Sequence, residues 1–252
     1  MTRVVAWNIR AGGGVRVGAI AANLAAWGAD VAALCEFRAT PPSRALAEAL
    51  ADQGLTHQVT TADPRRPALN RLLVASRWPL RRLRLASTPQ PRANWLPVRV
   101  ESPAPFTLAS LHIPIAAFAG QSRFAFHAAV LRIAGHWRRG PALIAGDTNT
   151  GRIDIDEEAP TFGKEADAWM ADMERAGWRD AFRALHGNER AYTWYSPNAG
   201  NGFRLDQAFV NRALLPRVAA VRYEWGRVPG SGANHRRDAV SDHAALLLDL
   251  SG

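Results

Sequence analysis

Short apolar runs that end in a polar side chain recur along the chain from residue 4 to residue 243. The first four runs end at Asn8, at Glu36, at His112, and at Asp147 with Asn149 close behind. Three later segments have the same character and supply Trp194, Asp206, Asp242 and His243. Buried strands of α/β proteins have such apolar sequences, and ligands bind at the sheet edge where the strands end. The pattern therefore predicts a sheet edge that carries carboxylates, amides and imidazoles.

The spacing of apolar positions separates helices from strands. It predicts helices over residues 15–28, 40–54, 121–137 and 166–176. It predicts strands over residues 3–8, 30–36, 72–76, 80–86, 96–100, 106–112, 142–145, 203–210, 219–225 and 243–250. The strands between residues 72 and 112 follow one another too closely for helical crossovers, which favours antiparallel pairing. We expect an α/β fold formed as a four-layer sandwich: two mixed, mostly antiparallel sheets packed face to face, with helices outside.

Composition supports a globular protein and adds little else. A chain of 252 residues with 48% apolar residues suits one large domain, and we expect a single domain over residues 1–252. A strand begins almost at the N-terminus, so no secretory signal is expected, and the apolar run 244–248 is too short to cross a bilayer. The single cysteine, Cys35, fits a reducing compartment. We expect a cytoplasmic monomer without a membrane partner.

The net charge points to an anionic partner. Lys and Arg number 31 against 22 Asp and Glu, which gives a formal charge of +9, and nearly all the excess is arginine. Arginine makes bidentate contacts with phosphate, so nucleic acid is the expected partner. A GC-rich genome would enrich arginine equally well, and composition alone does not separate the two explanations.

Three oxygen-bearing side chains are candidates for metal binding. Glu36 follows five apolar residues, where a carboxylate is costly unless it is paired or bound to a metal. An ion pair with Arg38 would satisfy it equally well. Asp242 and Asn8 would complete a hard-oxygen set of the kind that Mg²⁺ or Mn²⁺ prefers.

Asp147 and Asn149 are candidates for handling the attacking water. They follow the apolar residues 143–145, so both project from a sheet edge. Asp147 would accept the proton of a water that Asn149 positions. An Asp and an Asn after a strand also commonly form a turn, which is the simpler alternative.

The two histidines at strand ends are candidates for contacting phosphate. His243 would do so if a second carboxylate oriented its ring, and Asp206 is the candidate for that carboxylate. Asn70, at a strand start, would orient His112 in the same way. The alternative for each histidine is an ordinary loop position, and the acidic run 154–158 is expected to be a solvated loop.

Taken in order, these segments resemble the endonuclease/exonuclease/phosphatase superfamily over nearly the whole chain. The resemblance is carried by Trp7-Asn8, Glu36, Ser76-Arg77, His112, Gly146-Asp147-Thr148-Asn149, Arg204-Leu205-Asp206 and Ser241-Asp242-His243. It implies the four-layer α/β sandwich and the hydrolysis of phosphate esters with Mg²⁺ or Mn²⁺.

The second half is most similar to exodeoxyribonuclease III and the abasic-site endonucleases, through residues 178–183, 192–194 and 202–206. That resemblance implies a small apolar pocket for a base-free sugar, lined by Trp194, Phe203 and Leu205. Core packing is the equal alternative for these three residues.

The first half departs from the abasic-site enzymes at four positions. Cys35 stands where glutamine is usual, Arg38 where lysine is usual, and Arg10 where an acidic or amide residue is common. His112 replaces the tyrosine of repair enzymes and resembles the histidine of deoxyribonuclease I and the sphingomyelinases. A DNA nuclease is therefore predicted, with its preference for abasic sites left open.

Two other functions remain as alternatives. One is a phosphatase or phosphodiesterase acting on a lipid or a small molecule, for which the nearest apolar loop, residues 113–119, is short. The other is a non-catalytic binding domain, which would have no need of the acidic and imidazole positions. DNA against RNA, exonuclease against endonuclease, one metal against two, and Asp147 against His243 as the base all stay open.

Overall fold

Strand β1 (Thr2–Asn8) lies inside a six-stranded sheet, between β14 (Ala245–Leu250) and β2 (Val31–Phe37). The computed structural model describes residues 1–85, 87–115, 123–228 and 239–252. The sheet order is β13-β14-β1-β2-β4-β3, with β3 (His57–Thr60), β4 (Arg71–Ser76) and β13 (Val218–Glu224). Strands β1 and β2 run parallel and the other neighbours run antiparallel, so the sheet is mixed.

The second six-stranded sheet has the order β5-β6-β7-β8-β12-β9. Its strands are β5 (Leu80–Arg82), β6 (Trp95–Val100), β7 (Phe106–His112), β8 (Ala142–Asp147), β9 (Trp178–Asp180) and β12 (Asp206–Asn211). Only β7 and β8 pair in parallel. A separate ribbon joins β10 (Trp194–Tyr195) to β11 (Gly202–Phe203).

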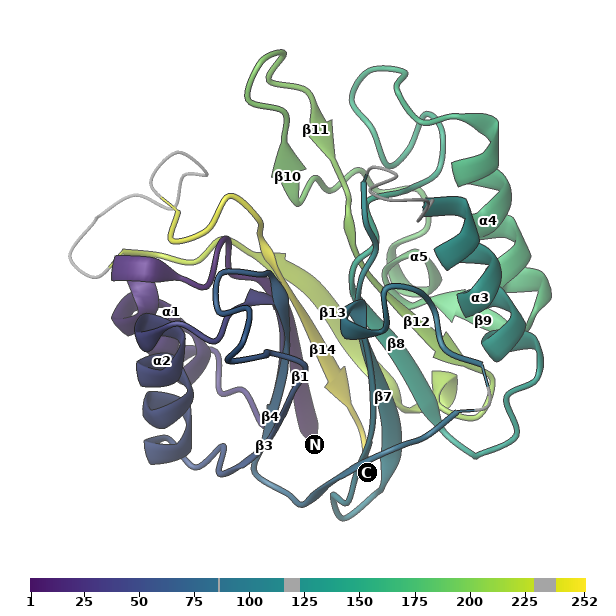
Figure 1. The fold of residues 1–252 in the computed structure, drawn as a ribbon. Helices are drawn as coiled ribbons and strands as arrows, with labels where there is room; N and C mark the ends of the chain where they lie inside the picture. The colour runs from purple at the N-terminus through teal and green to yellow at the C-terminus, as the bar shows by residue number, and fades with distance from the viewer. Residues whose placement is uncertain (86, 116–122, 229–238) are drawn as a thin grey trace.

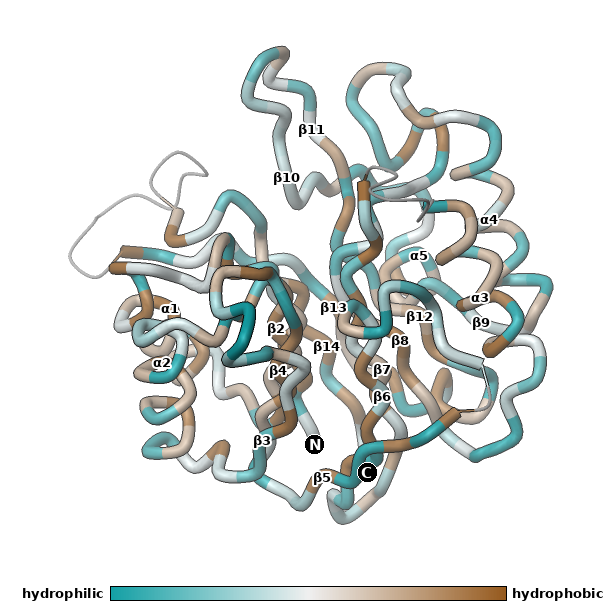
Figure 2. The backbone as a smooth tube through the Cα atoms, viewed as in Figure 1, coloured by the Kyte–Doolittle hydropathy of each residue, from teal (hydrophilic) through white to brown (hydrophobic). Residues whose placement is uncertain are grey.

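The helices form the two outer layers (Figure 1). Helices α1 (Val17–Ala26) and α2 (Pro41–Asp52) lie beside the first sheet, and α3 (Arg123–Gly135) and α4 (Lys164–Arg175) beside the second. Short helix α5 (Ala181–His186) packs against β12 and β13. One apolar core joins the two sheets and two others lie beneath the helices, so the apolar colouring follows the strands (Figure 2). This confirms the predicted four-layer sandwich.

Several boundaries differ from the sequence prediction. Strands β3 and β9 and helix α5 were not predicted, because they are too short to show a period. The strand predicted over 203–210 is divided, since Arg204 and Leu205 leave the sheet and bond to residues 156 and 148 through their backbones. Residue 86 of the predicted strand 80–86 and residues 121–122 of the predicted helix 121–137 lie outside the described residues. No helix of the described part is long and apolar enough to span a membrane.

Candidate active site

Strand register brings the predicted polar residues to one edge of the paired sheets. His112 at the end of β7 lies beside Asp147 at the end of β8, and Asp206 at the start of β12 lies opposite Asp147. In the other sheet, Asn8 at the end of β1 lies beside Cys35, one residue before Glu36. Both sheets therefore deliver their polar strand ends to the same place.

Asp147 is the centre of this cluster and is only 2% exposed. Its Oδ2 accepts a hydrogen bond of 3.0 Å from Asn8 Nδ2 and lies 3.6 Å from His112 Nε2 and 3.9 Å from His243 Nε2. Its other oxygen accepts a 3.0 Å bond from the backbone nitrogen of Asn149. Burial raises the pKa of Asp147, and the two nearby imidazoles offset part of that rise. A carboxylate with a raised pKa is a better proton acceptor than an ordinary one.

His243 is oriented by the carboxylate that the sequence suggested. Its Nδ1 lies 2.9 Å from Asp206 Oδ2, and Asp206 is 1% exposed. Burial lowers the pKa of His243, but the carboxylates of Asp206 and Asp147 outweigh it and raise the pKa to about 9. His243 is therefore an imidazolium at neutral pH, with Nε2 directed toward Asp147.

Glu36 occupies a bulge in strand β2. The pairing register between β2 and β4 shifts at this residue, and its backbone has the left-handed φ of 61°. Non-glycine residues in this region cost about 1–3 kcal/mol and cluster at functional sites. Ala11 N donates a 2.7 Å bond to Glu36 Oε2, whereas Oε1 receives only a long 3.4 Å bond from Asn8 Nδ2. One carboxylate oxygen is thus left available.

Asp242 lies at the rim of the same cluster. Ser241 fixes this segment to the end of β1, because its hydroxyl donates a 2.7 Å bond to the carbonyl of Asn8. The Asp242 side chain is 41% exposed and lies 3.8 Å from Arg10 Nε. Its other side-chain contact among the described residues is a long 3.4 Å bond that Oδ1 accepts from the Ser241 hydroxyl, so Asp242 is largely open to solvent and to a ligand.

The donors in this group fit a Mg²⁺ or Mn²⁺ ion. In the described part of the chain, no group of three or more His, Cys, Asp or Glu side chains is clustered to enclose a metal. Mg²⁺ needs less than that, because it keeps several waters and is held by one or two carboxylates together with substrate phosphate. Glu36 and Asp242 supply the carboxylates, and Asn8 is hydrogen-bonded to Glu36.

Asn149 and Asn70 have contacts that the sequence did not suggest. Asn149, with φ of 47°, donates from Nδ2 to the carbonyl of Ile113 at 2.7 Å, so its amide braces the turn after β8. Asn70 accepts a 2.7 Å bond from Arg38 Nε, and no hydrogen bond joins it to His112 within the described residues. The described contacts therefore do not show the expected orientation of His112 by Asn70.

Asn94, and not Asn70, is the asparagine that contacts His112. It donates from Nδ2 to the backbone carbonyl of His112 at 2.8 Å. It belongs to the short 3-10 helix η2 (Arg92–Asn94), which precedes β6. The sequence signal was absent, because the contact is made to the main chain and not to the imidazole. The alternative ion pair between Arg38 and Glu36 is also absent among the described contacts.

The three apolar candidates are close together but mostly buried. Phe203 and Leu205 are each 7% exposed. The Phe203 ring packs against Phe162 at 5.5 Å and Trp194 at 6.0 Å between ring centroids. Trp194 is half-buried, and its ring lies 6.3 Å from that of His243. Trp194 is thus the member of the set that borders His243.

A buried cluster of ion pairs around Arg204 was not predicted from the sequence. Arg204 is 0% exposed and binds Asp156 through Nε at 2.7 Å and Nη2 at 3.0 Å, and Asp180 through Nη2 at 2.6 Å. Asp156 and Glu157 are buried, so the expectation of a solvated loop over 154–158 is wrong for these two. Burial raises the pKa of Asp156, but Arg204 and Arg183 outweigh it and hold the pKa below its usual value.

The fold and the cluster define a class. Two mixed sheets packed face to face, with carboxylates, amides and a carboxylate-oriented imidazole at one edge, form the scaffold of a hydrolase acting on phosphate esters. The family model for the endonuclease/exonuclease/phosphatase family matches residues 5–243. The chain belongs to this family, which confirms the resemblance noted from the motifs. No curated protein sequence matches the chain.

Solved structures with the same fold include three of nucleic-acid enzymes, two of them of NExo from Neisseria. The chain is similar to an AP endonuclease from Archaeoglobus fulgidus, with 17% identity and a TM-score of 0.77. It is also similar to the 3′-5′ exonuclease NExo from Neisseria meningitidis (19%, 0.76) and to the 3′ phosphatase NExo from Neisseria bound to a product DNA hairpin (18%, 0.75). Each alignment covers 100% of both chains. At these identities the likeness establishes the fold.

Proposed function

We propose that the protein is a divalent-metal-dependent phosphodiesterase and specifically a DNA nuclease. One observation carries the proposal: Asp147 Oδ2 lies within 3.9 Å of both His112 and His243 and is bonded to Asn8, which in turn contacts Glu36. A proton acceptor, two phosphate-binding imidazoles and a hard-oxygen group therefore share one sheet edge.

In this proposal each side chain has one task. Asp147 accepts a proton from the attacking water through Oδ2, the oxygen that faces both imidazoles. The imidazolium of His243, oriented by Asp206, donates a hydrogen bond to the phosphate as negative charge develops, and His112 contacts the same group. Glu36, Asp242 and Asn8 would hold Mg²⁺ or Mn²⁺, whose positive charge stabilises the transition state.

DNA is the substrate that charge and likeness favour. The chain carries a formal charge of +9, and one of the similar solved structures is bound to a product DNA hairpin. If about five arginines contact phosphates, the logarithm of the association constant for duplex DNA falls with log[salt] at a slope of about −4 to −5. A small-molecule or lipid substrate would show little such dependence.

The proposal is tested by cleavage of end-labelled single-stranded, duplex and abasic oligonucleotides with Mg²⁺, with Mn²⁺ and with EDTA. We expect cleavage that depends on metal and is lost in EDTA. Glu36→Ala should remove several kcal/mol of transition-state stabilisation and so slow cleavage, while the fold persists. Cleavage of no oligonucleotide under either metal, or full activity in EDTA, would contradict the proposal.

A preference for abasic sites is a finer proposal, supported by the matching second half of the chain. A base-free sugar has nothing to unstack, so flipping it costs a few kcal/mol less than flipping an intact nucleotide. Phe203→Ala should then erase a preference for abasic duplex while general cleavage survives. Equal cleavage of abasic and intact duplex by the unaltered protein would leave Phe203 and Leu205 with packing roles alone.

A further inference from the structure

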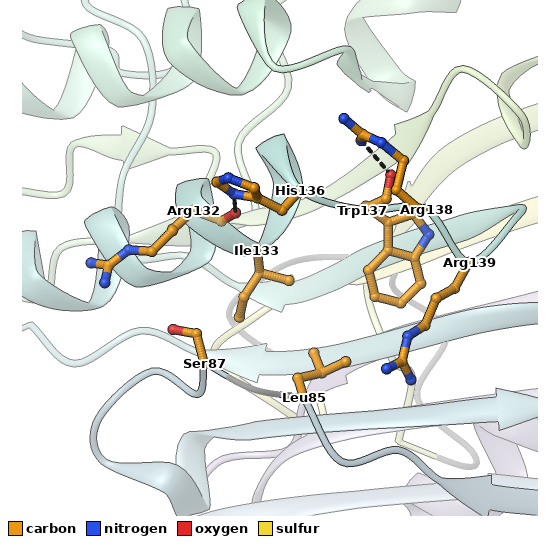
Figure 3. Close-up of a pocket in the computed structure, with 8 residues that line it drawn as sticks. All are labelled: Leu85, Ser87, Arg132, Ile133, His136, Trp137, Arg138 and Arg139. Atoms are coloured by element: carbon orange, nitrogen blue, oxygen red, sulfur yellow. Dashed lines mark hydrogen bonds between the residues drawn. The ribbon is translucent and has the colours of Figure 1, made fainter.

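A hollow lies at the C-terminal end of helix α3, outside the site already described. It has a volume of about 320 Å³. Its apolar lining comes from Leu85, Ile133 and Trp137, and its charged lining from Arg132, Arg138 and Arg139. Figure 3 shows Ile133 and Trp137 pointing from the helix side toward Leu85, with the arginines around them. We call this the α3 pocket.

The α3 pocket is far from the catalytic groups. Arg123, the first residue of α3, donates from Nη1 to the carbonyl of Asn149 at 3.2 Å, so the helix begins at the catalytic edge. The 13 residues of α3 rise by about 1.5 Å each, which places the other end about 20 Å away. Arg132 and Trp137 belong to that other end.

A groove adjoins the pocket on the side of strand β6. It has a volume of about 700 Å³ and shares Leu85 with the α3 pocket. Its lining includes Arg82, Arg84, Arg92, Trp95 and Pro97. Pro97 and Trp95 of β6 pair with Ala109 and Leu111 of β7. The groove therefore extends along β6 toward the strand end that carries His112.

The pocket and the groove are strongly basic and lack acidic partners. No carboxylate is among the residues that line them. Five of their arginines have side chains without a hydrogen bond or ion pair to another described residue: Arg82, Arg84, Arg92, Arg132 and Arg139. By contrast, Arg81 and Arg99 nearby share Glu101. Unpaired guanidinium groups in two adjoining hollows suit a ligand with several phosphates.

Trp137 offers the pocket an aromatic ring on which a base can stack. The indole is held in place, because its Nε1 donates a 3.0 Å bond to the carbonyl of Gly140 and its ring packs edge-on against Trp178 at 6.2 Å. It is half-buried, so part of the ring remains accessible. Sites for single-stranded nucleic acid combine a cationic groove that follows the backbone with an aromatic ring on which a base stacks.

We propose that the α3 pocket and its groove form a second binding site for single-stranded nucleic acid. A base enters the pocket beside Trp137, and the groove arginines contact the phosphates. The choice of nucleic acid as ligand rests on the proposed nuclease function, whereas the site itself lies outside the catalytic residues. A strand held there and at the catalytic edge together is anchored at two points about 20 Å apart.

Binding of a fluorescent oligothymidylate of about 16 nucleotides, a length at the upper end of typical single-strand sites, tests the proposal. Anisotropy is measured in EDTA, with the oligonucleotide checked for integrity on a gel. Arg84→Gln/Arg139→Gln should raise Kd about tenfold and lower the salt slope by about 1.4, since each single-strand contact contributes about 0.7. The control Arg179→Gln/Arg222→Gln removes the same charge from residues that already pair with Glu174 and Glu224, and should change Kd less than twofold.

Trp137→Leu separates base stacking from charge. It should raise Kd for oligothymidylate about tenfold and leave binding of inorganic polyphosphate unchanged. A melting curve checks its fold, and the arginine pair tests the site if this variant does not fold. Parental affinity of the arginine variant would overturn the proposal, as would polyphosphate competing as well as oligothymidylate. Failure of the nuclease function would appear as absent cleavage with metal and would leave this EDTA measurement intact.

Discussion

Two buried charged groups lie two residues apart on the chain and have opposite surroundings. Arg204 is fully buried, and Asp156, Asp180 and Tyr223 all contact its guanidinium. Asp206 is equally buried, but one oxygen contacts only His243 and the other, Oδ1, has no partner among the described residues. The saturated cluster holds the backbone in place, whereas the second, unsaturated pair leaves one buried carboxylate oxygen without a partner among the described residues.

The two clusters are physically connected. Tyr223 accepts a bond from Arg204 Nη1 at 3.3 Å and donates one to the carbonyl of Asp206 at 2.8 Å. Asp180 also caps α5, because its Oδ1 accepts from Phe182 N at 3.0 Å. The saturated cluster thus fixes the strand start from which Asp206 reaches His243. Substitutions in the two clusters should separate stability from turnover.

The largest effect is expected at Asp147, which lies beside the Asp206–His243 pair. Asp147→Asn removes the proton acceptor while keeping the size of the side chain, so kcat should fall by about 10⁴-fold. The melting temperature should stay the same or rise, since a buried carboxylate is neutralised. Oligonucleotide binding should persist or tighten. Retention of more than a tenth of the parental kcat would remove Asp147 from the chemistry.

Substitution in the Arg204 cluster should lower the stability of the fold. Arg204→Leu leaves Asp156 and Asp180 as buried charges with fewer partners, which costs about 3–5 kcal/mol in the free energy of unfolding. Urea denaturation measures this loss. The matched control is Arg175→Leu, which breaks an exposed pair with Asp172 and should cost about 1 kcal/mol or less. Equal losses would mean that burial of the Arg204 cluster is energetically irrelevant.

A double-mutant cycle sharpens the role of Asp206. His243→Ala and Asp206→Ala should each reduce kcat/KM. The double variant should lose about 2 kcal/mol less transition-state stabilisation than the two single variants added together. The reason is that Asp206 has no ring to orient once His243 is gone. Asp249→Ala, which removes a carboxylate bound to Arg3 on the other sheet, serves as a control that should combine additively with His243→Ala. Simple multiplication of the His243 and Asp206 effects would contradict the pairing.

The strand-end rule explains what could be predicted from sequence. Asn8, Glu36, His112, Asp147 and Asp206 lie at or near the ends of apolar strands. Register aligns them within each sheet, and the packing of the two sheets brings the two sets together. The fold class followed from the same pattern.

Contacts made by irregular segments could not be predicted. Asn94 acts through the main chain of His112, and Asp156 lies in a loop whose acidic run suggested solvent. Asn70 is a further case, since its position at a strand start gave no indication that its side chain accepts a bond from Arg38. Pairings of this kind depend on loop paths, which carry no periodic signal.

His127 extends the comparison to a histidine with no carboxylate beside it. It is 3% exposed, stacks on Trp169 at 4.4 Å, and has no hydrogen bond at either ring nitrogen among the described residues. Burial, aided by Arg123, lowers its pKa to about 3, whereas the pKa of His243 is raised. The unfolded chain therefore binds a proton between pH 6.5 and 3 that the folded chain does not, and stability falls as pH decreases through this window.

The smallest predicted effect follows from that shift. With an unfolded pKa of about 6.5, His127 should cost about 1.4 kcal/mol of stability at pH 5.5 relative to pH 7.5. His127→Phe keeps an aromatic ring against Trp169 and should remove this part of the pH dependence, as measured by urea unfolding at both pH values. His136→Phe is the control, because His136 is exposed and its substitution should leave the dependence unchanged. An unchanged slope for His127→Phe would mean that the buried imidazole finds a partner for its proton, as His243 does.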